Sequence, residues 1–413
     1  MKRYRKMQFK AIMVVWGMVF LGFFVFIPSK SMAQKPEYMV LGLIGAFTGA
    51  YAPVIGPVCA GAEDGVKYVN EELGGIDGVK IKLENRDMQG NVALGLQQYA
   101  GLMESKPKPL FVAIVHAGIS EALREKLLAD GAIGLSQSTT VPCIYPRANT
   151  YGLSVMYPEA VALPLNWVKD NWKEGRNLRL GIITWDSAYG RGFITDEFFD
   201  YCKKIGVDIV GTELFKVGEV DVTTQMTRLR AKKPDWLATQ CMASGPISIL
   251  KAAKEMGWKI KLLGGYGLDE DTAVLDPELM EGSVGMHSCW PLNDRGHPGI
   301  KLLLRYMEKN KRTKMEQRTP YIYGWTMPQI MHKVVKDAVA KVGWSKLNLD
   351  AIKYEMNHLD FEPQNGLMKL AFTEKRPENR WCYVHKIQDG KAVVVSPGGG
   401  YVNPPDLMPA RFR

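Results

Sequence analysis

The chain has 413 residues and a formal net charge of +10. Six of its 53 Lys and Arg residues, and none of its 43 Asp and Glu residues, lie in residues 1–33, which leaves 47 basic against 43 acidic residues in the rest of the chain. This near balance, without a basic block interleaved with aromatic residues, argues against a nucleic-acid-binding protein. The roughly 380 residues that follow exceed what one compact core holds, and they predict two lobes.

The N-terminal segment has the order of a secretory signal peptide. Five basic residues lie in positions 2–10, an apolar run covers positions 11–27, and the small residues of Ser31-Met32-Ala33 follow. We therefore predict a cleaved signal peptide over 1–33, a mature chain that begins near Gln34, and a periplasmic location. The alternative is a permanent membrane anchor, because an apolar run of 17 residues is close to the shortest that spans a bilayer.

The six Cys residues are widely spaced, and none of them forms a C-x-x-C pair; they are Cys59, Cys143, Cys202, Cys241, Cys289 and Cys382. This spacing argues against a zinc site, and we expect neither a metal nor a cofactor. In an oxidising compartment one or two disulfides could form, but the spacing alone does not pair them.

Short β-rich runs alternate with helical segments along most of the chain. We expect strands at 38–44, 79–84, 110–115, 133–136, 178–184, 208–215, 236–241 and 261–264. We expect helices between them at 60–72, 93–105, 120–130, 159–171, 192–205, 223–232 and 247–256. Apolar strands separated by helices are typical of parallel sheets built from right-handed βαβ units, so the sequence predicts a doubly wound α/β fold.

The eight strands form two similar sets of four, with a change near 151–158. Further along, we expect a long helix at 321–342 and then a β-rich end at 367–372, 381–387 and 392–396. Asp389-Gly390 has the composition of a tight hairpin turn. The Gly- and Pro-rich tail from position 397 is expected to be irregular. Ligands of such sheets bind at the carboxyl ends of the strands, where helix N-termini present free N–H groups.

Four segments together resemble one known family. The segments VLGLIGAFTG at 40–49, GAEDGV at 61–66, VNEELGGI at 69–76 and IITWDSAYGRG at 182–192 are similar to those of the branched-chain amino-acid-binding proteins that serve ABC importers, the leucine/isoleucine/valine-binding family. The order of elements agrees over the whole chain after position 33.

The resemblance implies a type I periplasmic binding fold, in which two doubly wound, Rossmann-like lobes are joined by three crossovers. The crossovers would lie near 151–158, 287–291 and 357–365. Lobe 1 would comprise residues 36–155 plus 291–356, and lobe 2 would comprise residues 156–290 plus 357–413. Hinge closure on a small-molecule ligand would then be read by an ABC permease in the membrane. We expect a monomer.

The resemblance also places the ligand carboxylate between two loops of lobe 1. One loop follows the third strand and contains His116, Ala117 and Gly118, and the other follows the fourth strand and contains Ser138 and Thr140. Free N–H groups at a helix start and Ser or Thr hydroxyls can hold an anion without a bulky cation. The alternative for the second loop is ordinary turn chemistry. His116 replaces a small residue, and it either adds a hydrogen-bond donor or merely lines the loop.

Aromatic side chains would complete the site. The resemblance implies that Tyr189 closes over the ligand from lobe 2, although core packing is an alternative. Trp185 at the same strand end and Tyr51 in the first loop could supply aromatic walls. Met242 would line the opposite edge.

One departure from the family bears on the ligand. Members that bind amino acids commonly place a carboxylate, which pairs with the ligand ammonium, where this chain has Tyr266. An ammonium left unpaired in a closed cleft costs several kcal/mol, on the order of the penalty for a buried charge. Either Asp269 or Asp271 substitutes through a shifted loop, or the ligand has no ammonium and is an aromatic or branched acid or an amide.

The sequence gives little support to an enzyme. It contains no G-x-S-x-G, no H-E-x-x-H and no P-loop, and the His287-Ser288-Cys289 segment lies at an expected crossover. We therefore expect no catalytic residues. A periplasmic receptor that signals to a partner remains an alternative to transport, because this fold serves both roles.

Overall fold

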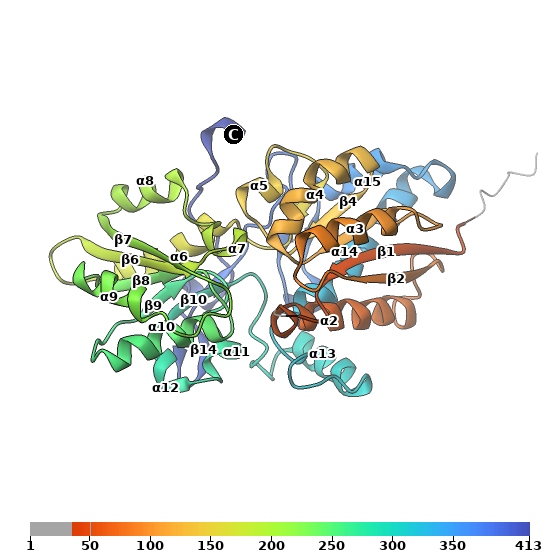
Figure 1. The fold of residues 1–413 in the computed structure, drawn as a ribbon. Coiled ribbons are helices and arrows are strands. Elements are labelled where there is room, and N and C mark those ends of the chain that lie inside the picture. The colour runs from red at the N-terminus through yellow and green to blue at the C-terminus, as the bar shows by residue number, and fades with distance from the viewer. Residues whose placement is uncertain (1–34, 50) are drawn as a thin grey trace, which may run out of the picture. The chain divides into compact units, whose positions relative to one another are not determined.

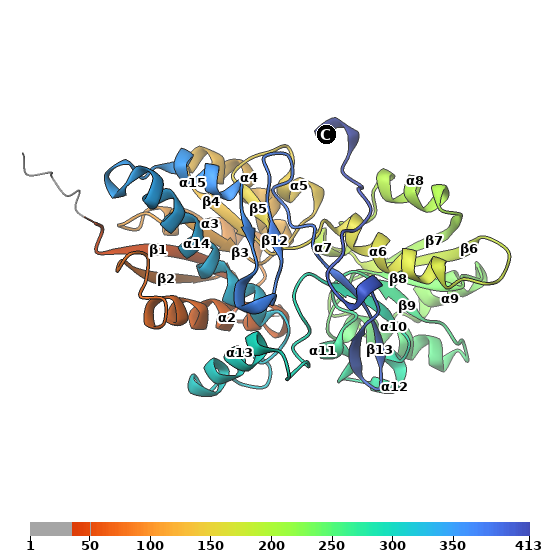
Figure 2. The ribbon, with the colours of Figure 1, turned by 180° about the vertical axis from the view of Figure 1, so that it is seen from behind.

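A computed structural model describes residues 35–49 and 51–413. The predicted signal peptide lies outside the described residues. Residues 36–413 form a single unit that contains two large, mainly parallel sheets (Figures 1 and 2). Among the described residues, no helix is both long and apolar enough to cross a membrane.

The first sheet has five parallel strands in the order β2-β1-β3-β4-β5. Their bounds are β1 Tyr38–Gly45, β2 Lys80–Asp87, β3 Phe111–Ile114, β4 Ile133–Ser136 and β5 Thr150–Gly152. The helices in this part of the fold are α2 Ala52–Glu71, α3 Val92–Met103, α4 Ala117–Asp130, α5 Val141–Ile144, α13 Pro298–Lys309, α14 Tyr321–Val342 and α15 Leu349–Met356. We call this sheet with its helices the first lobe.

The second sheet has seven strands in the order β14-β13-β10-β9-β8-β6-β7. Their bounds are β6 Leu178–Trp185, β7 Val207–Phe215, β8 Trp236–Thr239, β9 Leu262–Gly264, β10 Val284–His287, β13 Tyr383–Gln388 and β14 Lys391–Val394. The helices of this second lobe are α6 Tyr157–Asp170, α7 Ala188–Arg191, α8 Asp196–Lys204, α9 Thr223–Ala231, α10 Ser244–Glu255, α11 Glu270–Ala273 and α12 Pro277–Met280. Only β13 and β14 are antiparallel to their neighbours.

Both sheets contain the same doubly wound core. The first five strands of each lobe have the order 2-1-3-4-5, counted along the chain, which confirms the predicted repeat of topology. The hairpin at Asp389-Gly390 is also confirmed, because both residues have the positive φ values, 50° and 71°, that a type I′ turn needs.

Several predicted elements differ from those observed. The expected helix at 192–205 is observed as α8 alone and begins only at Asp196, because the side chain of its N-cap residue Thr195 accepts a hydrogen bond from the N–H of Phe198. The short helix α7 lies just before the expected range and was not predicted. The expected strand at 367–372 is reduced to β12, Leu370–Ala371, which pairs with β11, Asp360–Phe361. The sequence analysis did not predict β5, β10, α13 or α15.

The chain passes between the two lobes three times. The first passage lies between β5 and α6, and the second lies between β10 and α13. The third was expected at 357–365, but that segment still lies beside the first lobe, where the Tyr151 hydroxyl donates to Asn357 Oδ1 at 2.7 Å. The chain joins the second sheet only at β13, so the third passage lies between β12 and β13, later than predicted. The lobe boundaries as a whole stay a prediction.

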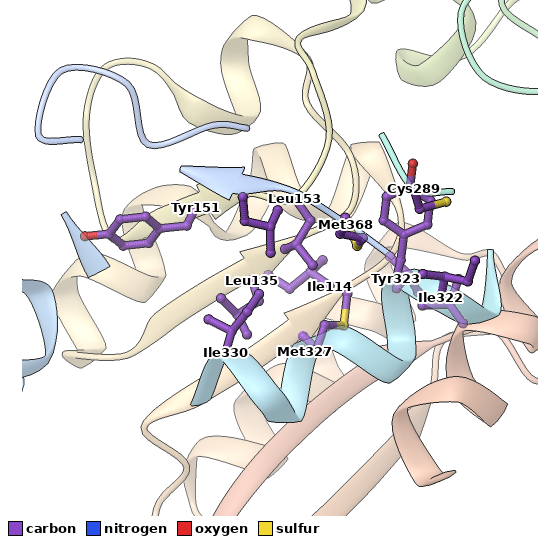
Figure 3. Packing of buried hydrophobic residues seen from close by; sticks show 14 of the residues in the cluster. Ile114, Leu135, Tyr151, Leu153, Cys289, Ile322, Tyr323, Met327, Ile330 and Met368 are labelled. Atoms are coloured by element: carbon purple, nitrogen blue, oxygen red, sulfur yellow. The ribbon is translucent and has the colours of Figure 1, made fainter. Parts of the chain in front are cut away.

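Buried apolar side chains of α14 pack against the first sheet (Figure 3). Met327 and Ile330 of α14 lie beside Ile114 and Leu135, which come from β3 and β4. Met368, from the segment before β12, packs into the same cluster. The core of the first lobe therefore includes residues from the segment that leads to the third passage.

Helices α2 and α14 approach each other so closely that their backbones touch. A Cβ atom built on Gly61 would lie 2.0 Å from the carbonyl oxygen of Tyr321, and one built on Gly324 would lie 1.8 Å from the carbonyl oxygen of Val58. No side chain fits at either position without moving a helix. This contact fixes α14, and the loop before it, against the start of the first lobe.

All six Cys side chains are buried and unpaired in the described residues, which include every Cys of the chain. None of the disulfides that the composition allowed is present. The two sheets and their core therefore hold together without a covalent cross-link.

We predict that Gly324→Ala destabilises the protein by about 1–3 kcal/mol or more, because the added methyl group forces α2 and α14 apart. The matched control is Gly56→Ala in α2, where an added Cβ meets no atom within 4 Å. This control should stabilise the helix by about 1 kcal/mol. Urea unfolding of both variants measures the difference, and equal stabilities would contradict the packing described.

Candidate functional site

A cavity lies at the carboxyl ends of strands from both sheets, and its empty space, counted together with the part open to solvent, is about 800 Å³. Four of the predicted site residues line it from the first lobe: Tyr51, His116, Ala117 and Ser138. Four line it from the second lobe: Trp185, Tyr189, Met242 and Tyr266. The structure does not place Gly118 or Thr140 among the lining residues. Parallel strands explain this convergence, because their carboxyl ends share one edge of a sheet.

The N-terminus of α4 opens into this cavity. His116 is its N-cap residue, and its side chain makes no capping hydrogen bond. The carbonyl oxygen of His116 accepts the first hydrogen bond of the helix, from the N–H of Ser120 at 2.9 Å. Because the His116 side chain does not cap the helix, the free N–H groups of the first turn have no side-chain partner. A 14-residue helix with an uncapped N-terminus favours an anion there.

The neighbouring loop after β4 is held in place by hydroxyl groups. The Ser136 hydroxyl donates to the carbonyl oxygen of Ser138 at 2.7 Å and also lies 2.7 Å from the Ser120 hydroxyl oxygen. Both Ser136 and Ser138 are buried. These hydrogen bonds hold the loop that carries Ser138 next to the start of α4, where Ser138 lines the cavity.

Thr140 has a different role from the one predicted. Its hydroxyl donates to Glu121 Oε1 at 2.5 Å, and its oxygen accepts the N–H of Cys143 at 3.3 Å as the N-cap of α5. Both contacts lie within the first lobe. The turn-chemistry alternative therefore describes Thr140, whereas Ser138 lines the cavity.

His116 packs edge-on against Tyr51, with ring centroids 5.0 Å apart. Burial lowers the pKa of His116 to about 4, so the imidazole is neutral at pH 7. Its Nδ1 atom has no hydrogen-bond partner among the described residues. His116 can therefore offer a ligand a hydrogen bond but not a charge.

Four aromatic rings form the opposite wall. Tyr157 and Tyr189 meet edge-on with centroids 5.2 Å apart, and Trp185 lies 6.2 Å from Tyr189. Tyr266 lies 6.1 Å from Tyr157. The sequence analysis missed Tyr157, because it follows the first passage rather than a strand end and no motif marks it. This wall suits a flat or branched apolar group.

Tyr266 also connects the cavity to the passages between the lobes. Its hydroxyl oxygen accepts the N–H of Val155 at 2.9 Å and lies 2.9 Å from the Ser288 hydroxyl oxygen. Val155 belongs to the first passage, and Ser288 begins the second. The carbonyl oxygen of Tyr266 accepts a hydrogen bond from the Tyr189 hydroxyl at 2.9 Å. The phenol group of Tyr266 is therefore already engaged by the hinge segments.

Asp269 lines the cavity. It is one of the two residues that could replace the acidic partner of the family if the loop after β9 is shifted. Its Oδ2 atom lies 3.0 Å from His287 Nε2, and its Oδ1 atom accepts the N–H of Thr272 at 2.9 Å. Burial alone would lower the pKa of His287, but the hydrogen bond with Asp269 raises this pKa well above its ordinary value. The same contact outweighs burial and lowers the pKa of Asp269. The pair is therefore an ion pair with no net charge.

We predict that Tyr266→Phe lowers the free energy of unfolding by about 1–3 kcal/mol, because it leaves the buried N–H of Val155 without its main acceptor. The matched control is Tyr354→Phe, since the Tyr354 side chain is exposed and the change should have an effect within about 0.5 kcal/mol. Urea unfolding of the ligand-free protein measures both. Identical stabilities would show that the hydroxyl does not bind the hinge segments.

Comparison with known proteins agrees with this geometry. Residues 39–391 match the family described as periplasmic binding protein. No curated protein sequence matches the chain. Three similar solved structures share the fold at low sequence identity.

The first is a branched-chain amino acid ABC transporter protein from Thermus thermophilus with bound valine. It is 20% identical, with a TM-score of 0.79, and the match covers 92% of this chain and 99% of that chain. The second is a fatty acid ABC transporter substrate-binding protein from Thermomonospora curvata. It is 18% identical, with a TM-score of 0.74, and the match covers 88% of this chain and 94% of that chain.

The third is an ABC transporter solute-binding protein from R. palustris in complex with 4-hydroxybenzoate. It is 17% identical, with a TM-score of 0.70, and the match covers 89% of this chain and 97% of that chain. These structures confirm the two-lobe type I periplasmic binding fold. The family consists of solute-binding proteins, so this protein is not an enzyme. Since the match spans most of the sequence, the chain belongs to the periplasmic binding protein family.

Proposed function

We propose that this protein captures a small carboxylate-bearing ligand between its lobes and delivers it to an ABC importer. The observation that carries the proposal is the cavity between the carboxyl ends of two sheets, with an uncapped helix N-terminus and Ser138 on one side and aromatic rings on the other. The signal-peptide pattern supports export to the periplasm, where a membrane permease would be the partner.

The charges around the cavity support a single carboxylate. Among the described residues, no Lys or Arg lines it, and the charges of Asp269 and His287 cancel each other. The N-terminus of α4 therefore supplies the favourable field for an anion. The three similar structures have names that refer to valine, a fatty acid and 4-hydroxybenzoate, which share only a carboxylate.

A thermal-shift screen of the mature protein tests the function. The panel comprises amino acids, aromatic and aliphatic acids, and their amides. A ligand that binds only the folded state raises the melting temperature, by an amount that grows with its concentration. A shift with at least one carboxylate supports the proposal, and a chemically altered product after incubation would overturn it.

Ser138→Ala should weaken binding of the carboxylate that the screen identifies by roughly ten-fold or more. A charge-assisted hydrogen bond contributes about 1.5–3 kcal/mol, and about 1.4 kcal/mol corresponds to one decade in Kd. Thr140→Ala is the matched control, because it removes a helix cap outside the cavity. It should cost about 1 kcal/mol of stability and leave Kd nearly unchanged. Calorimetry that shows wild-type affinity for Ser138→Ala would remove this loop from the proposed site.

We further propose that the ligand is an aromatic or branched acid rather than a zwitterionic amino acid. By the family resemblance, Tyr266 occupies the position where members that bind amino acids commonly have an acidic partner. The carboxylate of Asp269 is already neutralised by His287. A ligand ammonium would have to compete with His287 for this carboxylate in a buried site, which is costly.

Isothermal titration with valine and with 3-methylbutanoate, its counterpart without the amino group, discriminates the two ligand classes. The pair 4-hydroxyphenylalanine and 3-(4-hydroxyphenyl)propanoate, which differ only in the amino group, extends the test to aromatic bodies. We expect the acids without an amino group to bind more tightly. Binding of valine that is lost when its amino group is removed would show that Asp269 pairs with an ammonium.

A further inference from the structure

A second point of contact between the lobes lies beside the ligand cavity. It joins Thr319, in the loop before α14, to two consecutive acidic residues of α11. The hydroxyl of Thr319 donates to Glu270 Oε1 at 2.7 Å, and its N–H donates to Asp271 Oδ2 at 2.8 Å. Thr319 is fully buried.

These hydrogen bonds cross between the lobes. Helix α14 packs along α2 in the first lobe, where the glycine contacts fix its start. Helix α11 packs against α10, α12 and β14 in the second lobe. A hinge movement that separates the lobes must therefore break both hydrogen bonds and expose the two carboxyl groups to water.

We propose that Thr319, Glu270 and Asp271 form a latch that holds the lobes together and that closes more readily when its carboxyl groups are protonated. The inference rests on the proposed function only in that lobe closure is how this protein would retain its ligand. None of the three residues needs to touch that ligand.

The geometry favours a protonated Glu270 in the closed latch. Its Oε2 atom is buried and has no hydrogen-bond partner among the described residues, so an ionised carboxylate would place buried charge on an oxygen that no donor stabilises, which costs more than a neutral carboxyl group at the same place. Burial and the nearby Asp269 raise the pKa of Glu270, although His287 and the Thr319 hydroxyl act in the opposite sense. Burial, Asp269 and Glu270 likewise raise the pKa of Asp271.

The surrounding charges do not cancel this effect. The ion pair of Asp269 with His287 carries no net charge, and burial lowers the pKa of His385 to about 4, so that ring is neutral. Arg318 lines the same recess as Asp271, but no ion pair joins the two among the described residues. The charged residues on the elements packed against α11 are exposed and screened by solvent; they are Lys251, Lys254, Glu255, Glu278 and Lys391.

The direction of the pH dependence follows from linkage. A carboxyl group whose pKa is higher in the closed state than in the open state binds more protons when the lobes close, so closure is favoured as pH falls. For each carboxyl whose pKa is one unit higher in the closed state, the ratio of closed to open protein rises up to about tenfold.

Small-angle scattering of the ligand-free protein at pH 5 and pH 8 tests the latch. We expect the wild type to have a smaller radius of gyration at pH 5 than at pH 8. The double variant Glu270→Gln with Asp271→Asn mimics the protonated groups and should be equally compact at both pH values. Thr319→Ala removes one hydrogen bond and should be more open at pH 5 than the wild type.

The matched control is Glu278→Gln, because this α12 side chain is 83% exposed and lies outside the latch. It should respond to pH as the wild type does. A wild type that does not respond to pH, or a double variant with the wild-type response, overturns the latch. Since no ligand is present, neither result bears on the ligand screen, so failure of the latch and failure of the proposed function are distinguishable.

Discussion

The site depends on the hydroxyl group of Tyr266, which binds the cavity wall to the segments that connect the lobes. The partners of this hydroxyl, Val155 and Ser288, belong to two different passages. The backbone carbonyl oxygen of Tyr266 accepts a hydrogen bond from Tyr189 of the aromatic wall. A displacement of Tyr266 in the cavity wall would therefore also displace the segments that connect the lobes. One side chain therefore both lines the cavity and holds the segments that connect the lobes.

Much of the fold could be predicted from local patterns. Apolar β-rich runs identified eight strands, and the parallel topology followed from the helices between them. Strand ends of parallel sheets converge, and the family resemblance implied which loops hold the ligand; the loops after β1, β3, β4, β6, β8 and β9 could therefore be assigned to one cavity without coordinates. Strands β5 and β10 were missed because they have three and four residues and lie at expected crossovers, where no repeat marks them.

The parts that were wrong or open depend on contacts between distant residues. Ser138 and Thr140 are two residues apart in a Ser/Thr run, but only the surrounding fold decides that Thr140 bonds to Glu121 while Ser138 lines the cavity. The partners of Tyr266 lie 111 and 22 residues away along the chain. The third passage at 357–365 was taken from the family resemblance, which does not reveal that this part of the chain forms the short β11–β12 pair and reaches the second sheet only at β13.

The six buried thiols have a practical consequence. Burial raises the pKa of Cys143, Cys202 and Cys241 to about 12, and it raises those of Cys59, Cys289 and Cys382 as well, so each native thiol is both shielded and protonated at neutral pH. A single exposed cysteine introduced at the rim of the cavity would have an ordinary thiol pKa and would react first with a maleimide dye. The protein can thus be turned into a fluorescent sensor without first removing its own cysteines.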